Sequence, residues 1–173
     1  MEIKTERLLL TPHGIKFLDT VHEYASDLEN TKYMMWLPND TIDETADFLR
    51  KSDAEWAKEL PSYYEFAVIF DGKQVGAVSI YLDDERTTGE FGWILNKRYW
   101  NKGIATEAAK ALFDFGINEL GIKCFQAHCD SENVASSKVM EKLGMKRMSC
   151  EGGRKNKSSN EERCEFMYEL KVG

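Results

Sequence analysis

Three strand patterns follow one another between residues 63 and 95, and one helical pattern separates them from a fourth. "YYEFAVIF" and "QVGAVSIYL" are joined by "DGK", a strong hairpin signal, and "TTGEFGWIL" follows the charged turn "DDER". A helix is expected from about Gly103 to Leu120, before the apolar run "IKCFQAHC". The strand–helix–strand connection requires a right-handed parallel crossover, whereas hairpins are antiparallel. The sequence therefore predicts an α/β (α+β) protein with a mixed, mostly antiparallel sheet.

The flanking segments supply the remaining elements. "IKTERLLLTP" predicts a first strand near residues 3–11, and "GIKFLDTVHEYASD" has helical spacing. Thr41 and Glu44 form a capping-box pattern at the start of a second helix. "NVASSKVMEKLG" predicts a helix closed by Gly144, with Val134 on its apolar side. Two final strands, "MKRMSC" and "RCEFMYELKV", flank a polar segment expected to be a mobile loop. The predicted order is β-α-α-β-β-β-α-β-α-β-β in one domain, residues 1–173.

Composition excludes several classes of protein. The net charge of −7 argues against a general nucleic-acid binder, which normally presents a basic face. No apolar run approaches the roughly 20 residues that cross a bilayer. The four cysteines have no C-x-x-C pairing, so no metal is expected. They are interpreted as reduced, mostly buried thiols of a cytoplasmic protein, because no signal peptide precedes the first strand pattern.

The start of the central helix, "YWNKGIATEA", has the features of an anion-binding loop. A helix N-terminus carries partial positive charge and several free N–H donors. Gly103 and Ala105 leave the backbone accessible, and Lys102 adds a full positive charge. No G-x-x-x-x-G-K-[ST] or G-x-G-x-x-G pattern is present, so neither a P-loop nor a dinucleotide fingerprint explains it. A plain strand-to-helix turn is the alternative for this stretch alone.

A second helix start strengthens the hypothesis of a binding site. "ENVASSKVMEKLGM" places Asn133, Ser136, Ser137 and Met140 on one helix face, at spacings of three and four. These polar residues could be only an N-cap, with Asn133 as the capping side chain. The segment nevertheless follows a strand expected to lie beside the one that leads into the first loop. Both helix starts should then lie at the same end of the sheet, where ligands gather in open α/β arrangements.

Together, "YWNKGIATEA" and "ENVASSKVMEKLGM" resemble the GNAT superfamily of acetyltransferases. "TERLLL" and "EFGW" extend the similarity to the branch of RimJ/RimL-type ribosomal-protein N-terminal acetyltransferases, so it covers nearly the whole chain. The resemblance implies the GNAT fold, with about seven strands splayed between the fourth and the fifth. It also implies acetyl-CoA as cosubstrate.

The resemblance further implies where acetyl-CoA would bind. Its pyrophosphate would lie on backbone N–H groups from Asn101 to Thr106, and its pantetheine arm along the strand edge at residues 93–95, much as a peptide adds a strand. Asn133 would reach the pantetheine from the other side. The chain departs from the family pattern at Trp100, where Gln or Arg is usual, and at Asn101, where glycine is usual. The expected cofactor-binding residues are Trp93, Ile94, Leu95, Trp100, Asn101, Lys102, Gly103, Ile104, Ala105, Thr106, Asn133 and Ser136.

Acetyl transfer to an amine needs a group that takes a proton from the amine. By strand alternation Glu90 shares a face with Gly92 and Ile94, and it is the preferred base; Glu65 is the second candidate. A solvated glutamate or a structural ion pair is the alternative interpretation of Glu90. His128 is interpreted as a strand histidine satisfied by its neighbours. The backbone N–H of Ile94, or of its neighbour, is expected to hold the oxyanion where the strand is distorted around Gly92.

Ser136 is expected to protonate the departing thiolate. This role follows from the resemblance. Related enzymes often use a tyrosine one turn further along for this proton transfer, but this chain has Met140 there, which cannot donate a proton. In RimJ/RimL-type enzymes the serine of an Asn-x-x-Ser spacing is the natural candidate, and Asn133 and Ser136 have that spacing. The sequence leaves the acceptor open between a protein N-terminus and a small amine such as a polyamine or aminoglycoside, in a monomer or homodimer. Two other functions also remain: a catalytically silent CoA-binding sensor domain, and nucleotide binding by the same helix end.

Overall fold

The computed structural model describes residues 1–173 and contains one eight-stranded sheet flanked by four α-helices. The strand order is β1-β2-β3-β4-β5-β6-β8-β7, and only the β5–β6 pair is parallel. The strands are β1 (Ile3–Lys4), β2 (Leu8–Pro12), β3 (Tyr63–Phe70), β4 (Lys73–Leu82), β5 (Thr88–Leu95), β6 (Cys124–Asp130), β7 (Lys146–Lys155) and β8 (Glu162–Lys171). The predicted mixed, mostly antiparallel sheet with one parallel crossover is confirmed.

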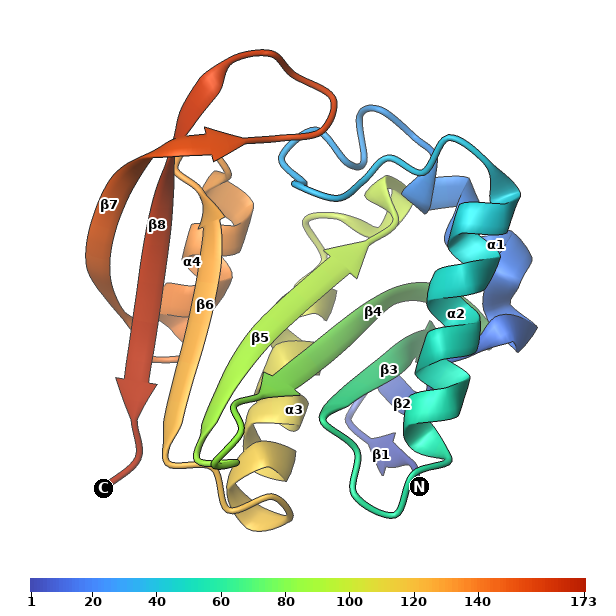
Figure 1. The fold of residues 1–173 in the computed structure, drawn as a ribbon. Helices are drawn as coiled ribbons and strands as arrows, with labels where there is room; N and C mark the ends of the chain where they lie inside the picture. The colour runs from blue at the N-terminus through green and yellow to red at the C-terminus, as the bar shows by residue number, and fades with distance from the viewer.

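The helices cover both faces of this sheet. The helices are α1 (Leu18–Ala25), α2 (Ile42–Trp56), α3 (Ile104–Asn118) and α4 (Val134–Lys142), with short 3-10 segments η1 (Ile15–Phe17) and η2 (Lys97–Tyr99). Helices α1 and α2 lie on one face, over the strands near the N-terminus, and α3 and α4 lie on the other (Figure 1). In front of β5 and β6, the α1–α2 face carries no helix (Figure 1).

Local chemistry explains where several elements begin and end. Asp71 and Gly72 have φ values of 51° and 76°, so the β3–β4 hairpin turns through two left-handed residues, as two-residue hairpins prefer. The hydroxyl of Thr41 accepts a hydrogen bond from the Glu44 N–H at 3.3 Å and caps α2. Gly144 follows α4 with φ 85°. These predicted turns and caps are confirmed.

Two apolar clusters hold the layers together. The larger cluster lies between the sheet and α3, where Phe113 packs at 4.5 Å from Phe125 and 6.3 Å from Phe91, measured between ring centroids. The smaller one joins α1 and α2 through Val21, Tyr24, Ala25 and Leu49, and Ile94 of β5 packs against it. Phe91 and Ile94 therefore point to opposite faces of β5.

Four expectations for the outer parts of the chain are wrong in detail. The segment expected as a single first strand forms the antiparallel pair β1–β2. Strand β7 extends to Lys155 and so includes part of the segment expected as a mobile loop, because that segment pairs with β8. Cys150 and Cys164 are exposed, whereas Cys129 is buried, because the outermost strands have no layer over the two exposed thiols. Val134 is also exposed, at 56%.

Candidate active site

Strands β5 and β6 separate halfway along their length. They pair only from Thr88 with Cys124 to Phe91 with Ala127, yet β5 continues to Leu95 and β6 to Asp130. The two strands diverge toward the end of the sheet where α3 and α4 begin (Figure 1). The predicted splay between the fourth and fifth expected strands is confirmed. It leaves the inner edge of residues 92–95 without a neighbouring strand.

Alternation along β5 determines which backbone groups face this gap. The N–H of Asn96 donates to Val75 on the β4 side at 2.8 Å, so Ile94 and Gly92 also bond toward β4. Trp93 and Leu95 therefore present their N–H groups to the gap. The β4–β5 register is continuous through Gly92, so the expected distortion there is absent. The Ile94 N–H therefore points toward β4, and of the expected oxyanion donors only its neighbours on β5 point into the gap.

The loop before α3 exposes a run of backbone donors. Asn101 and Gly103 adopt left-handed conformations, with φ values of 62° and 74°, and α3 begins at Ile104. No N–H group from residue 101 to residue 106 donates a hydrogen bond within the protein. The indole Nε1 of Trp100 donates to the Leu95 carbonyl at 2.9 Å and ties the loop to the end of β5. This arrangement has the donors that an anion at a helix start requires.

An acidic residue in the first turn of α3 is neutralised by the N-terminal segment. The carboxylate of Glu107 accepts bonds from the Thr5 hydroxyl at 2.6 Å and from Arg7 Nε at 2.7 Å. Burial raises the pKa of Glu107, but the bonds from Thr5 and Arg7 outweigh burial and lower it. Arg7 Nη1 also donates to the Lys102 carbonyl at 2.8 Å. The pattern "TERLLL" was part of the family resemblance, but its contact with this loop was not predicted.

The start of α4 places one hydroxyl beside β5. The Asn133 side chain caps the helix by accepting from the Ser136 N–H at 3.3 Å. The Ser136 hydroxyl accepts from the Trp93 indole Nε1, also at 3.3 Å. Ser137 and Met140 are buried. Of the polar face expected on this helix, Ser136 therefore contacts the splayed part of β5, and Asn133 acts as the cap.

Glu90 and His128 form a pair on the opposite side of the sheet. Glu90 Oε1 lies 2.8 Å from His128 Nδ1, with 54% of the glutamate side chain and 32% of the histidine side chain exposed. The hydrogen bond to Glu90 raises the pKa of His128 despite the opposing effect of burial. The expectation that His128 bonds a neighbour is confirmed for Nδ1 alone, and that partner was not predicted. The parallel register, which sets Phe91 against Ala127, would have indicated this pair.

Glu65, the second candidate base, lies deeper under the α1–α2 face. The residue is only 6% exposed, and its carboxylate accepts a bond from the Tyr81 hydroxyl at 2.7 Å. Burial raises the pKa of Glu65 to about 7, against the effect of the Tyr81 bond. Strand β4 separates it from β5, because Glu65 pairs with Ser79 and Ser79 pairs with Gly92.

The β7–β8 hairpin and the α1–α2 connection meet at the splayed end. Arg154 donates to the Tyr33 carbonyl at 2.8 Å, and the Lys157 N–H donates to the Met34 carbonyl at 3.1 Å. Arg154 also pairs with Glu165 at 2.6 Å. In Figure 1 the hairpin reaches over the end of β5 and β6 toward this connection. The two segments enclose the end of the site at which the acceptor is expected.

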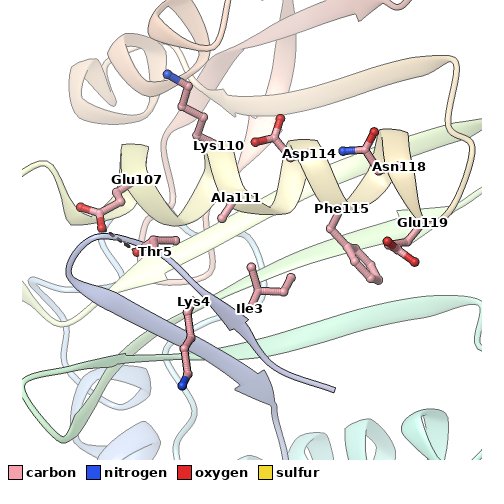
Figure 2. Close-up of a pocket in the computed structure, with 10 residues that line it drawn as sticks. All are labelled: Ile3, Lys4, Thr5, Glu107, Lys110, Ala111, Asp114, Phe115, Asn118 and Glu119. Carbon is pink, nitrogen blue, oxygen red and sulfur yellow. Dashed lines mark hydrogen bonds between the residues drawn. The ribbon is translucent and has the colours of Figure 1, made fainter.

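The groove in Figure 2 is a separate feature. Its volume is about 410 Å³, and Glu107, Lys110, Asp114, Ile3 and Thr5 are among its lining residues, so it lies between β1 and α3. It includes no residue of β5, β6 or α4. The candidate site is therefore the gap between the splayed strands.

No cluster of three or more histidine, cysteine, aspartate or glutamate side chains with metal-binding geometry occurs. None of the helices combines the length and apolarity needed to cross a bilayer.

A sheet splayed between two parallel strands, with a helix start on each side of the gap, is the arrangement expected from the resemblance to acetyltransferases. The Acetyltransferase (GNAT) domain family matches residues 7–146. An uncharacterized N-acetyltransferase of Bacillus subtilis (strain 168), YnaD, is 34% identical over 151 residues, which cover 85% of this chain and 84% of that protein. This chain belongs to the GNAT acetyltransferase family, and the expected enzyme class is confirmed.

Solved structures agree with this assignment. An acetyltransferase (GNAT family) from Bacillus anthracis has a TM-score of 0.82 and 34% identity, covering 99% of this chain and 98% of that one. RimL, the ribosomal L7/L12 α-N-protein acetyltransferase, solved in complex with coenzyme A, has a TM-score of 0.88 and 15% identity, with the same coverage. At that identity RimL shares the fold alone, so the similarity to the RimJ/RimL branch stays a prediction.

Proposed function

We propose that this protein transfers an acetyl group from acetyl-CoA to a primary amine by direct attack in a ternary complex. The observation that carries the proposal is the inner edge of residues 92–95, which has no neighbouring strand and lies beside two helix starts. The Bacillus relative that shares 34% identity is named an N-acetyltransferase, and the RimL structure contains coenzyme A. Both agree with this reaction.

The loop before α3 would hold the pyrophosphate of acetyl-CoA. The N–H groups of residues 101–106 lack internal partners, and neutralisation of Glu107 removes a charge that would repel phosphate. The N–H and carbonyl groups of Trp93 and the N–H of Leu95 would pair with the pantetheine arm as an added strand does. The Leu95 carbonyl already accepts bonds from Asn30 and Trp100, so it would not take part. Asn133 and Ser136 would line the other side of the arm.

The polar residues around the gap supply the proton transfers. Glu90 lies on the face that the acceptor would approach, and it would assist removal of the proton of the amine, directly or through a neighbour. Ser136 lies on the other face and would return a proton to the departing thiolate. The α-amine of a peptide, with a pKa near 8, is neutral in about a tenth of molecules at pH 7, so a carboxylate can assist it. The acceptor is proposed to be a protein N-terminus or a small amine such as a polyamine or aminoglycoside.

Four free cysteines agree with a reducing compartment such as the cytoplasm.

Calorimetric titration with acetyl-CoA and with CoA, followed by a thiol-release assay over an amine panel, tests the proposal. The panel contains peptides with free N-termini, polyamines and aminoglycosides. We expect binding of both cofactor forms and acceptor-dependent release of CoA. Binding without release for any amine would indicate the silent sensor domain instead. Competition by ATP or GTP at similar affinity would indicate a general nucleotide site.

A further inference from the structure

We propose that His128 is the catalytic base that takes the proton of the acceptor amine, and that Glu90 is a positioning residue that orients its ring. The inference rests on the proposed function and assigns Glu90 a narrower role within it. It is carried by the contact between these two side chains at the point where β5 and β6 separate.

The contact determines which ring nitrogen is available. An ionised carboxylate only accepts hydrogen bonds, so the 2.8 Å contact requires a proton on His128 Nδ1. In the neutral ring the lone pair is then on Nε2, for which the protein supplies no partner. Nε2 is therefore the atom that can accept a proton. Glu90 Oε1 already accepts this bond, so of the two side chains it is His128 that presents a nitrogen lone pair without a partner.

The position of His128 on β6 suits the task. The last β5–β6 pair joins Phe91 to Ala127, so His128 is the first residue of β6 beyond the ladder. Its bond to Glu90 places the ring on the same face as Glu90, whereas Ser136 bonds Trp93 from the opposite face. A base and an acid would thus stand on opposite sides of the gap, one toward the acceptor and one toward the thiol.

Charged side chains on the neighbouring strands surround His128. Glu90 on β5 faces it from one side, and Glu165 on β8 faces it from the other. Arg154 on β7 opposes Glu165 and pairs with it at 2.6 Å. Met167, the β8 residue in register with His128, carries no charge. The direct hydrogen bond to Glu90 is the largest of these effects, and it raises the pKa of His128.

The proton balance is simple. A neutral amine forms the C–N bond as the C–S bond breaks, and its nitrogen loses one proton to His128 Nε2. The sulfur leaves with the electron pair of the C–S bond and gains one proton through the Ser136 hydroxyl, which water replenishes. His128 then returns its proton to water, so no oxidant, reductant or further reactant is needed.

Glu65 is the rival base. Burial raises the pKa of Glu65 to about 7, but its carboxylate is bonded to Tyr81 and the residue is only 6% exposed. It lies on β3, with β4 between it and the gap. His128 borders the gap between β5 and β6, whereas Glu65 does not, so an amine bound at the edge of β5 would lie nearer to His128.

Three substitutions separate these roles. In His128→Asn the amide can still donate to Glu90, but the base is lost, so we expect kcat/KM to fall by about 10²–10⁴-fold. The Kd for acetyl-CoA should stay within about twofold and the melting temperature should be nearly unchanged. Glu90→Gln should lower kcat/KM by about tenfold and move the acidic limb of its pH profile to lower pH, because the carboxylate that raises the pKa of His128 is gone. Glu65→Gln should retain activity within about threefold.

Two readouts decide the outcome. Activity of His128→Asn within threefold of wild type, or a loss above 100-fold in Glu65→Gln alone, would overturn the assignment. NMR titration of the His128 ring in the wild type and in Glu90→Gln tests the pair without turnover, with His22, which bonds Thr45, as reference. An unaltered His128 titration would overturn the pair. If the His128 titration shifts in Glu90→Gln but the wild-type protein acetylates no amine, the proposed function is refuted and the hydrogen bond between Glu90 and His128 is established.

Discussion

Arg7 and Glu107 stand 100 residues apart in the chain and form a two-point contact. Arg7 Nε lies 2.7 Å from Glu107 Oε2, and the Arg7 N–H donates to Glu107 Oε1 at 2.9 Å. The same guanidinium donates to the Lys102 carbonyl at 2.8 Å. One side chain thus links the N-terminal segment both to the first turn of α3 and to the loop proposed to hold pyrophosphate.

Arg7→Gln is expected to weaken acetyl-CoA binding more than it weakens the fold. The variant releases the Lys102 carbonyl and leaves the Glu107 charge uncompensated near the phosphates. We expect Kd to rise about tenfold, roughly 1.4 kcal/mol. Arg50→Gln is the control, because Arg50 makes only an exposed pair with Asp47 at 3.6 Å. Equal affinities of the two variants in calorimetry would refute the role of Arg7.

Gly103→Val is expected to abolish detectable CoA binding and also to lower stability. Gly103 has φ 74°, a conformation that costs a β-branched residue on the order of 1–3 kcal/mol. Its side chain would also project bulk beside the free N–H groups. Gly72→Val is the matched control, since Gly72 has φ 76° and nothing within 4 Å of an added Cβ. Both variants should lose similar melting temperature, and only Gly103→Val should lose binding. Tight CoA binding by folded Gly103→Val would show that the pyrophosphate lies elsewhere.

Ser136→Ala is expected to lower kcat by about 10²-fold or more with little change in melting temperature. The helix cap would survive, because Asn133 accepts from the backbone N–H of Ser136 rather than from its hydroxyl. Ser137→Ala is the neighbouring control, with a buried hydroxyl that donates to the Asn133 carbonyl at 3.3 Å. It should cost about 1 kcal/mol of stability and little rate. If Ser136→Ala keeps kcat within about threefold, water or another group protonates the thiolate.

Glu65→Gln is expected to stabilise the protein at pH 8 and to have little effect at pH 5. Burial raises the pKa of Glu65 from its ordinary value of 4.5 to about 7. Between these values the folded state holds a proton that the unfolded chain has released, so the free energy of unfolding falls as pH rises. Glutamine removes this dependence, and the melting temperature at pH 8 should rise by about 3 °C or more.

Glu55→Gln provides a control of opposite sign. The bond from Lys58, with further bonds from Ser62, lowers the pKa of Glu55 to about 2. Its stabilisation is present above pH 4.5 and is lost as pH falls toward 2, so the substitution should destabilise the protein at pH 8. A Glu65→Gln variant less stable than wild type at pH 8 would contradict the effect of burial.

Features that depend on a few adjacent residues were predictable from the sequence. The turn at Asp71 and Gly72, the cap formed by Thr41 and Glu44, and the helix end at Gly144 agree with the structure. Each follows from backbone conformations and hydrogen bonds available within about four residues. The resemblance in the loop 99–106 and in the helix start 133–137 likewise pointed to the correct family.

Contacts between residues far apart in the chain could not be predicted from the sequence and are seen only in the tertiary structure. Strand alternation correctly placed Glu90 on the same face of β5 as Ile94. Its bond to His128, however, depends on the parallel register of β5 and β6. The pair Arg7–Glu107 and the exposure of Cys150 depend in the same way on strand pairing and on which layer covers each strand. Periodicity identifies the face on which a side chain lies, but the partner across that face depends on registers and layers formed by residues up to 100 positions away.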